Sequence, residues 1–186
     1  MQEYVFNLLS ENLPTTYYYH NLNHTREVMD RVIEIGTFEG CGPEELDLLL
    51  AAALWHDAGY ITVYKGHEEE SCRLAQKHLP SYGYTPEEIV HILGMISATK
   101  TPQDPQNKLE EIIADADLDY LGTDEVALKA GMLYEELHSL NSKLTKRAWR
   151  EQEIAFLRGH QYFTNFSKQK RQPRQREYLR SLMAPL

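Results

Sequence analysis

Apolar side chains recur at intervals of three and four residues along most of this 186-residue chain. That spacing places them on one face of an α-helix, and no stretch alternates apolar and polar residues as a half-buried strand does. The pattern therefore predicts an all-helical fold. Helices are expected at about residues 4–10, 22–37, 43–55, 68–79, 86–96, 109–121, 124–140 and 145–160, with a further short helix in the tail.

The segment LDLLLAAALW, residues 46–55, is apolar almost all round. Pro43 occupies a favoured first helical position, and Gly59 supplies a stop. We therefore expect this helix to lie at the centre of a helical bundle. It ends in His56 and Asp57, two groups that are costly to bury unless something binds them.

Length and organisation favour one globular unit. A chain of 186 residues can bury a substantial core, and no internal repeat or low-complexity linker divides it. We expect a single domain over residues 1–186, with the motif-bearing core at about 19–122 and a helical C-terminal extension at 123–186.

The charge and the cysteine content limit which partners, metal sites and cellular compartment we expect. The formal net charge of -9 argues against coating nucleic acid or an anionic membrane, so a phosphorylated substrate requires a local positive centre such as a metal. Cys41 and Cys72 lack CxxC spacing and predict neither a disulfide framework nor a thiolate zinc site. Because the chain shows no basic leader before a long apolar stretch, we expect a cytoplasmic protein.

Two imidazoles and two carboxylates are expected to meet beside the central helix. His24 lies 32 residues before His56 on another helix, and Asp117 lies 60 residues after Asp57 on a third. Each projects from or beside an apolar face. A bound metal ion would compensate the burial of such groups, so these four residues are the candidate ligands.

Three aspartates lie in the segment 109–121. Helical angles place Asp117 at the edge of the apolar face and direct Asp115 well away from it. Asp117 is therefore the predicted inward carboxylate. We interpret Asp115 and Asp119 as solvent-facing groups or as groups behind the ligands.

The ligand chemistry favours one divalent ion. A mixed nitrogen and oxygen set suits Mn, Fe, Mg, Ni or Co more than a closed tetrahedral zinc site, and it leaves positions for water or substrate. His20 lies one turn before His24, so the segment YYYHNLNH could present either histidine.

At these motifs the sequence resembles the HD-domain superfamily of metal-dependent phosphohydrolases. The resemblance rests on HTREVMD, LWHDAGY and IIADADLDYLG and covers about residues 19–122. It selects His24 over His20 and agrees with Asp117 as the last ligand. It implies an all-helical fold and hydrolysis of a phosphomonoester or phosphodiester bond, often in a nucleotide, and it implies a homodimer as one arrangement because family members are often dimers.

Some members of that superfamily hold two metals. They use an additional histidine shortly after the His-Asp pair and another in an I-x-x-H-T-type helix end. Here GHEEES supplies His67, but ISATK has Ala98 where the second histidine would fall. This departure favours a single metal.

Further residues receive weaker assignments. Asp57 could orient a water molecule as well as bind metal. His67 and Glu68 are expected to open a helix near the metal, where they could act as acid, base or supporting groups; the alternative is plain helix capping. Lys65, Lys100 and His20 are weak candidates for substrate contacts.

Two rival functions follow from the same residues. A dinuclear iron oxygenase on the same fold requires two metals, and Ala98 argues against it. A non-catalytic module would keep the metal as a structural staple and bind a partner or a nucleotide. The favoured hypothesis is a metal-dependent phosphohydrolase acting on a small phosphorylated substrate, without a membrane partner and with nucleic acid disfavoured.

Overall fold

Helix α3 (Pro43–Trp55) packs against helices α1, α2, α4, α5 and α6 in the computed structural model, which describes residues 1–184. Its side chains from Leu49 to Trp55, except that of Leu50, are buried, as the apolar sequence predicts. A central apolar helix is therefore confirmed. Its neighbours are α1 (Gln2–Asn12), α2 (Leu22–Phe38), α4 (His67–His78), α5 (Pro86–Ala98) and α6 (Lys108–Asp117).

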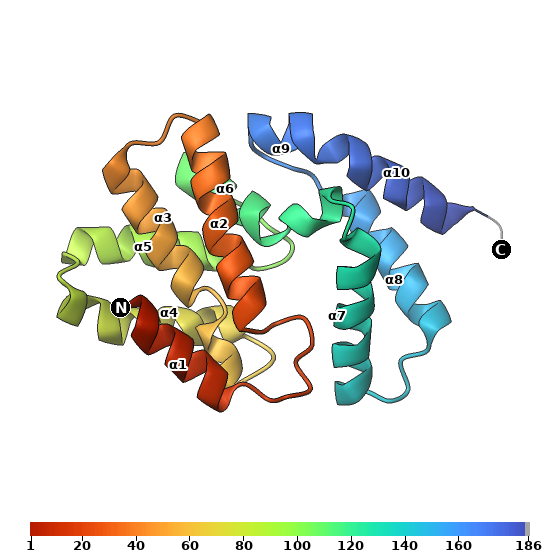
Figure 1. Cartoon of the computed structure of the whole chain (residues 1–186), viewed down its shortest axis with the longest axis horizontal. Coiled ribbons are helices and arrows are strands. Elements are labelled where there is room, and N and C mark those ends of the chain that lie inside the picture. The colour runs from red at the N-terminus through yellow and green to blue at the C-terminus, as the bar shows by residue number, and fades with distance from the viewer. Residues whose placement is uncertain (185–186) are drawn as a thin grey trace.

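A second group of helices lies beside this bundle (Figure 1). It has a small apolar cluster of its own, formed by Leu118, Leu121 and Leu157. The short helices η1, η2 and η3 follow α3, α4 and α6, and the 184 described residues contain no strand. The bounds are α7 (Val126–Leu140), α8 (Lys146–Gly159), α9 (Asn165–Lys170), α10 (Gln172–Met183), η1 (Ala58–Ile61), η2 (Leu79–Tyr82) and η3 (Asp119–Gly122).

Local capping explains where several helices begin. The Thr85 side chain accepts a hydrogen bond from Glu88 N–H, while the Glu88 carboxylate accepts one from Thr85 N–H, so α5 starts in a capping box. The side chains of Asn21 and Asn107 cap α2 and α6 by accepting hydrogen bonds from backbone N–H groups of the first turn. Each of these signals lies within a few residues of the helix that it caps.

The segment 109–121 departs from its prediction. The α-helix α6 ends at Asp117, and the chain turns at Leu118 into the short helix η3. Gly122 ends this turn against the backbone of Arg171, where an added Cβ would lie 2.5 Å from the Arg171 carbonyl oxygen. Likewise, the tail forms two helices, α9 and α10, where one short helix was expected. The C-terminal segment thus packs directly against the turn that follows α6.

No helix in residues 1–184 has both the length and the apolar character that a bilayer crossing requires.

Candidate metal centre

The local backbone aims the candidate ligands at one point. His24 lies in the first turn of α2, where the Asn21 side chain caps the helix and accepts from His24 N–H. His56 ends α3, and its Nδ1 lies 2.7 Å from the Ala53 carbonyl oxygen. A carbonyl can only accept, so Nδ1 carries a proton, and Nε2 presents a lone pair when the ring is neutral, as it must be to bind a metal. This tautomer is the one that a metal ligand requires.

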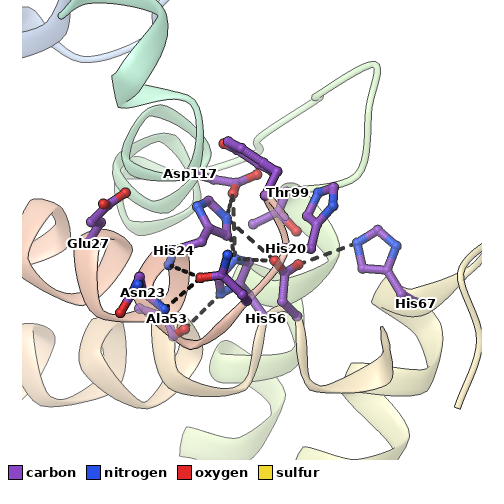
Figure 2. A network of polar contacts seen from close by, with 12 residues as sticks. His20, Asn23, His24, Glu27, Ala53, His56, His67, Thr99 and Asp117 are labelled. Atoms are coloured by element: carbon purple, nitrogen blue, oxygen red, sulfur yellow. Dashed lines mark hydrogen bonds and ion pairs between the residues drawn. The ribbon is translucent and has the colours of Figure 1, made fainter. Parts of the chain in front are cut away.

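Three of the four predicted ligands form a tight cluster, in which they point toward one another (Figure 2). His24 Nε2 lies 3.3 Å from His56 Nε2 and 3.1 Å from Asp117 Oδ1. The distance between His56 Nε2 and Asp117 Oδ1 is 3.5 Å. The prediction that three separate helices bring these residues together is confirmed.

Asp57 completes the set at one side of this cluster. Its Oδ2 lies 3.4 Å from His24 Nε2 and 3.2 Å from His56 Nε2. That oxygen is buried and has no hydrogen-bond partner among the described residues. A buried carboxylate oxygen without a partner is costly, and a cation would compensate it. The residues present therefore fit a divalent metal ion.

Burial and charge support the same conclusion. His56 is fully buried, which alone would lower its pKa, but the Asp57 and Asp117 carboxylates raise the pKa well above its usual range. Burial would raise the pKa of Asp117, yet hydrogen bonds from His24 and His56 lower it to about 2. The pKa of Asp57 is also well below normal, since the neighbouring His56 charge outweighs burial. Both carboxylates are thus held ionised, as ligands for a cation must be.

His67 and Glu68 both lie beside the cluster, where the sequence placed them. They open α4, and the His67 ring stacks on Tyr60 with centroids 3.8 Å apart. His67 Nε2 lies 3.5 Å from Asp57 Oδ1. This close placement depends on Gly59, because a Cβ there would lie 2.1 Å from the His67 carbonyl oxygen.

His20 is not part of the cluster, although it lines the cavity beside it, so the structure favours His24 over His20 as the metal ligand. The His20 Nδ1 atom pairs with the carboxylate of Glu136, which belongs to α7. Glu136 is fully buried and also accepts hydrogen bonds from Tyr19 N–H, at 2.9 Å, and from the Tyr64 hydroxyl, at 3.0 Å. Sequence reasoning missed Glu136. Its one local signal is its position at the edge of the apolar stripe of α7.

The two lysines do not reach the site. Lys65 is exposed, and Lys100 forms an ion pair with Glu69 on the surface. Neither belongs to the described residues that line the cavity next to the cluster. Their predicted contact with substrate therefore has no support in this arrangement.

The expectation of solvent-facing positions for Asp115 and Asp119 is wrong. Asp115 is fully buried and accepts hydrogen bonds from Thr164 N–H and Oγ1–H, at 2.8 and 2.6 Å. Asp119 is buried and pairs with Arg171 Nε at 2.7 Å. Both carboxylates hold the C-terminal helices rather than a metal. Helical angles could not show this, because the partners lie far along the chain.

A cavity of about 290 Å³ opens beside the metal cluster. Asp57, His67, Glu68 and Asp117 line one part of it, and residues of α7 and α8 line another. Side chains of the cluster thus face a space that a small molecule can enter.

The fold and the cluster define an all-helical protein with a His/Asp metal-binding arrangement. The family model "HD domain" matches residues 21–119, just over half of the chain, and the chain belongs to this family. A crystal structure of a predicted HD superfamily hydrolase from an uncultured Thermotogales bacterium is similar in fold. It has 24% sequence identity and a TM-score of 0.57, over 83% of this chain and 86% of that chain. No curated protein matches the chain.

Proposed function

We propose that this protein is a metal-dependent phosphohydrolase that cleaves a phosphomonoester or phosphodiester bond of a small molecule. The observation that carries the proposal is the buried Asp57 oxygen without a partner, next to two histidine Nε2 atoms and beside an open cavity. A metal that served only as a structural staple would need no such cavity, whereas a module that binds a nucleotide without turnover would use it.

Four residues would hold one divalent ion: His24, His56, Asp57 and Asp117. Bound there, the ion would supply a Lewis acid for the phosphoryl group and would acidify the attacking water. The second oxygen of Asp57, Oδ1, faces His67 Nε2 at 3.5 Å. In this proposal Asp57 would also orient the attacking water by accepting one of its hydrogen bonds.

His67 and Glu68 supply the proton for the leaving oxygen. Both line the cavity, and His67 Nδ1 lies 3.2 Å from the Tyr64 carbonyl oxygen. When Nδ1 donates to that carbonyl, protonated His67 has its Nε2–H directed to the site and can pass that proton to the leaving group. Loss of a general acid typically costs about 10²–10⁴-fold in rate.

Several features support this function over a dinuclear iron oxygenase. Within residues 1–184 the three-residue cluster of His24, His56 and Asp117 is the one group with metal-ligand spacing. Ala98 offers no ligand where a second histidine would be needed. A small phosphorylated substrate, nucleotides first, therefore remains the leading expectation.

The test is phosphate release by chelator-stripped protein against a panel of nucleotides and sugar phosphates, with Mn, Mg, Co, Ni and Fe added separately. We expect turnover that requires metal, that is abolished in Asp57→Ala, and that falls about 10²–10⁴-fold in His67→Ala. Asp104→Ala, an exposed carboxylate outside the site, is the control and should match wild type.

A different result would favour a binding role. Protein that binds one ion and gains stability from it, yet releases phosphate from no substrate with any metal, would be a metal-stabilised module. Oxygen consumption with two irons per chain would instead identify the oxygenase.

A further inference from the structure

The cavity beside the metal cluster has a wall that the HD-domain match does not include. The match ends at residue 119, whereas Leu133 of α7 and Trp149 and Phe156 of α8 line the same cavity as Asp57 and Asp117. The metal ligands and this wall therefore belong to different stretches of the chain. We call the cavity-lining residues of α7 and α8 the α7–α8 wall.

The α7–α8 wall is apolar and aromatic. Trp149 is half-buried, and Phe156 leaves 38% of its surface exposed although it is a large apolar residue. Tyr120 of η3 and Leu133 extend the same surface. Aromatic side chains of this kind bind flat rings by stacking and by burying apolar area.

Carboxyl groups dominate the charge around the cavity, and its two histidines, His20 and His67, each lie next to a carboxylate, that of Glu136 or Asp57. Among the described residues that line it, none is a lysine or an arginine, whereas Asp57, Glu68, Asp117 and Glu153 carry carboxyl groups. A metal ion could balance one phosphate group. Further phosphates would face carboxylates across an apolar wall, where repulsion is weakly screened.

The wall also offers groups that can recognise a ring edge. Glu153 accepts a hydrogen bond from the Tyr178 hydroxyl at 2.8 Å, and this contact with α10 fixes its carboxyl group. Gln152, its neighbour, lines the cavity as well and can both donate and accept. A ring that carries amino and carbonyl groups would find partners in this pair.

We propose that the α7–α8 wall binds the organic part of the substrate and selects a flat, uncharged heteroaromatic group attached to a single phosphate. A nucleoside monophosphate is the simplest member of this class; nucleoside triphosphates and simple sugar phosphates are disfavoured. This inference rests on the proposed phosphohydrolase activity and adds to it the residues that choose the substrate.

The test compares kcat/KM for adenosine 5′-monophosphate, adenosine 5′-triphosphate and ribose 5-phosphate in the presence of the activating metal. We expect the monophosphate to exceed ribose 5-phosphate by about tenfold or more, since stacking of one base contributes about 1–3 kcal/mol. We expect it also to exceed the triphosphate, because the cavity carboxylates repel the additional phosphates. Trp149→Ala should reduce the preference for the nucleotide over ribose 5-phosphate by about tenfold. Phe156→Ala should act in the same direction.

Phe38→Ala is the matched control. Phe38 is also a partly exposed phenylalanine, at 49%, but it lies on α2 and contacts Phe166, away from the cavity. The Phe38→Ala variant should have the same substrate preference as wild type. Equal kcat/KM for the three substrates, or a Trp149→Ala loss that is the same for all, would overturn the inference while leaving the phosphohydrolase intact.

A binding measurement separates the two hypotheses further. In Trp55→Phe protein, Trp149 is the remaining tryptophan of the two in the chain. We expect adenosine 5′-monophosphate to quench its fluorescence in a saturable way, and ribose 5-phosphate to leave it unchanged at the same concentration. Quenching without metal-dependent phosphate release would refute the activity and keep the binding site, whereas absence of quenching would refute the α7–α8 wall.

Discussion

At the scale of single residues, hydrogen bonds to backbone groups fix the two candidate histidine ligands in advance. The Ala53 carbonyl sets the tautomer of His56, and Asn21 fixes the first turn of α2 that carries His24. Asp57 Oδ2, by contrast, has no hydrogen-bond partner among the described residues. Carboxylate charges and histidine lone pairs that face one another repel. A cation bound between them therefore stabilises the folded protein.

Metal binding should therefore be visible as thermal stabilisation. Addition of Mn²⁺ to chelator-stripped protein is expected to raise Tm, because an ion that binds only the folded state adds about 2.7 kcal/mol at a concentration 100-fold above Kd. Asp117→Asn removes a ligand charge and should abolish most of the shift, while Asp104→Asn should retain it. Equal shifts in wild type and Asp117→Asn would place the ion elsewhere. Differential scanning fluorimetry provides the measurement.

Glu136 should be needed for stability rather than for metal binding. Its carboxylate accepts from two backbone N–H groups and the Tyr64 hydroxyl while fully buried. Glu136→Gln replaces one acceptor oxygen by a donor that faces these N–H groups, so we expect a loss of about 1–3 kcal/mol in the free energy of unfolding. Glu135→Gln, on the exposed side of α7, is the matched control. Urea denaturation of both variants decides the matter, and equal midpoints would contradict the assigned role.

His160 should make the protein less stable in mild acid. Burial lowers its pKa to about 4 from the ordinary value of 6.5, and Gln175 Nε2 donates to its Nδ1 at 2.6 Å. The unfolded chain therefore binds more protons below pH 6.5, and stability falls as the pH decreases from there to about 4. At pH 5 the expected loss is about 2 kcal/mol.

The measurement compares urea denaturation of wild type and His160→Gln at pH 7 and pH 5. The readout is the difference between the two proteins, because all other titratable groups are common to both. A smaller pH dependence in the variant supports the shifted pKa, and an identical dependence in the two proteins would refute it.

At the scale of elements, the sequence predicted what local signals decide. The start of α3 at Pro43 and the capping box of α5 lie inside the segments they organise, so these helices were located to within a few residues. The ligands His56 and Asp117 were readable because each lies on or beside an apolar face, whereas His24 was chosen over His20 through the family resemblance. The roles of Asp115 and Glu136 were not, since their partners lie 49 and 117 residues away along the chain.

The contact between η1 and α4 should tolerate no side chain at Gly59. A Cβ there would lie 2.1 Å from the His67 carbonyl oxygen and 2.8 Å from Ser71 N, which are backbone atoms that cannot swing aside. Gly59→Ala should displace the start of α4, cost about 1–3 kcal/mol or more, and reduce turnover by moving His67. Gly131→Ala is the control, because nothing lies within 4 Å of the added Cβ and alanine favours the helix. Similar unfolding curves for the two variants would contradict the close packing.

At the scale of the whole molecule, buried polar contacts join the HD-domain region to the C-terminal helices. Asp115 holds Thr164, Asp119 holds Arg171, and Glu136 holds the segment at Tyr19. Each pairing would leave a buried polar group without its partner if the two parts separated. These contacts support the prediction that residues 1–186 form a single domain.

That prediction implies one unfolding transition. Trp55 lies in the main core and Trp149 lies in α8, so Trp149→Phe and Trp55→Phe variants each report on one part. We expect their urea transitions, corrected for the stability of each variant by circular dichroism, to coincide with the loss of helix. A Trp149 signal that changes at lower urea than the helical signal would indicate that the C-terminal helices unfold separately.

The division of the cavity between two stretches of chain has an evolutionary consequence. The metal ligands lie within residues 21–119, whereas Leu133, Trp149 and Phe156 lie beyond them. Mutations in α7 and α8 can therefore alter which molecule is accepted without disturbing the ligand set. Natural selection could in this way diversify substrate choice while the hydrolytic machinery is inherited intact, and two proteins that share the HD region need not share a substrate.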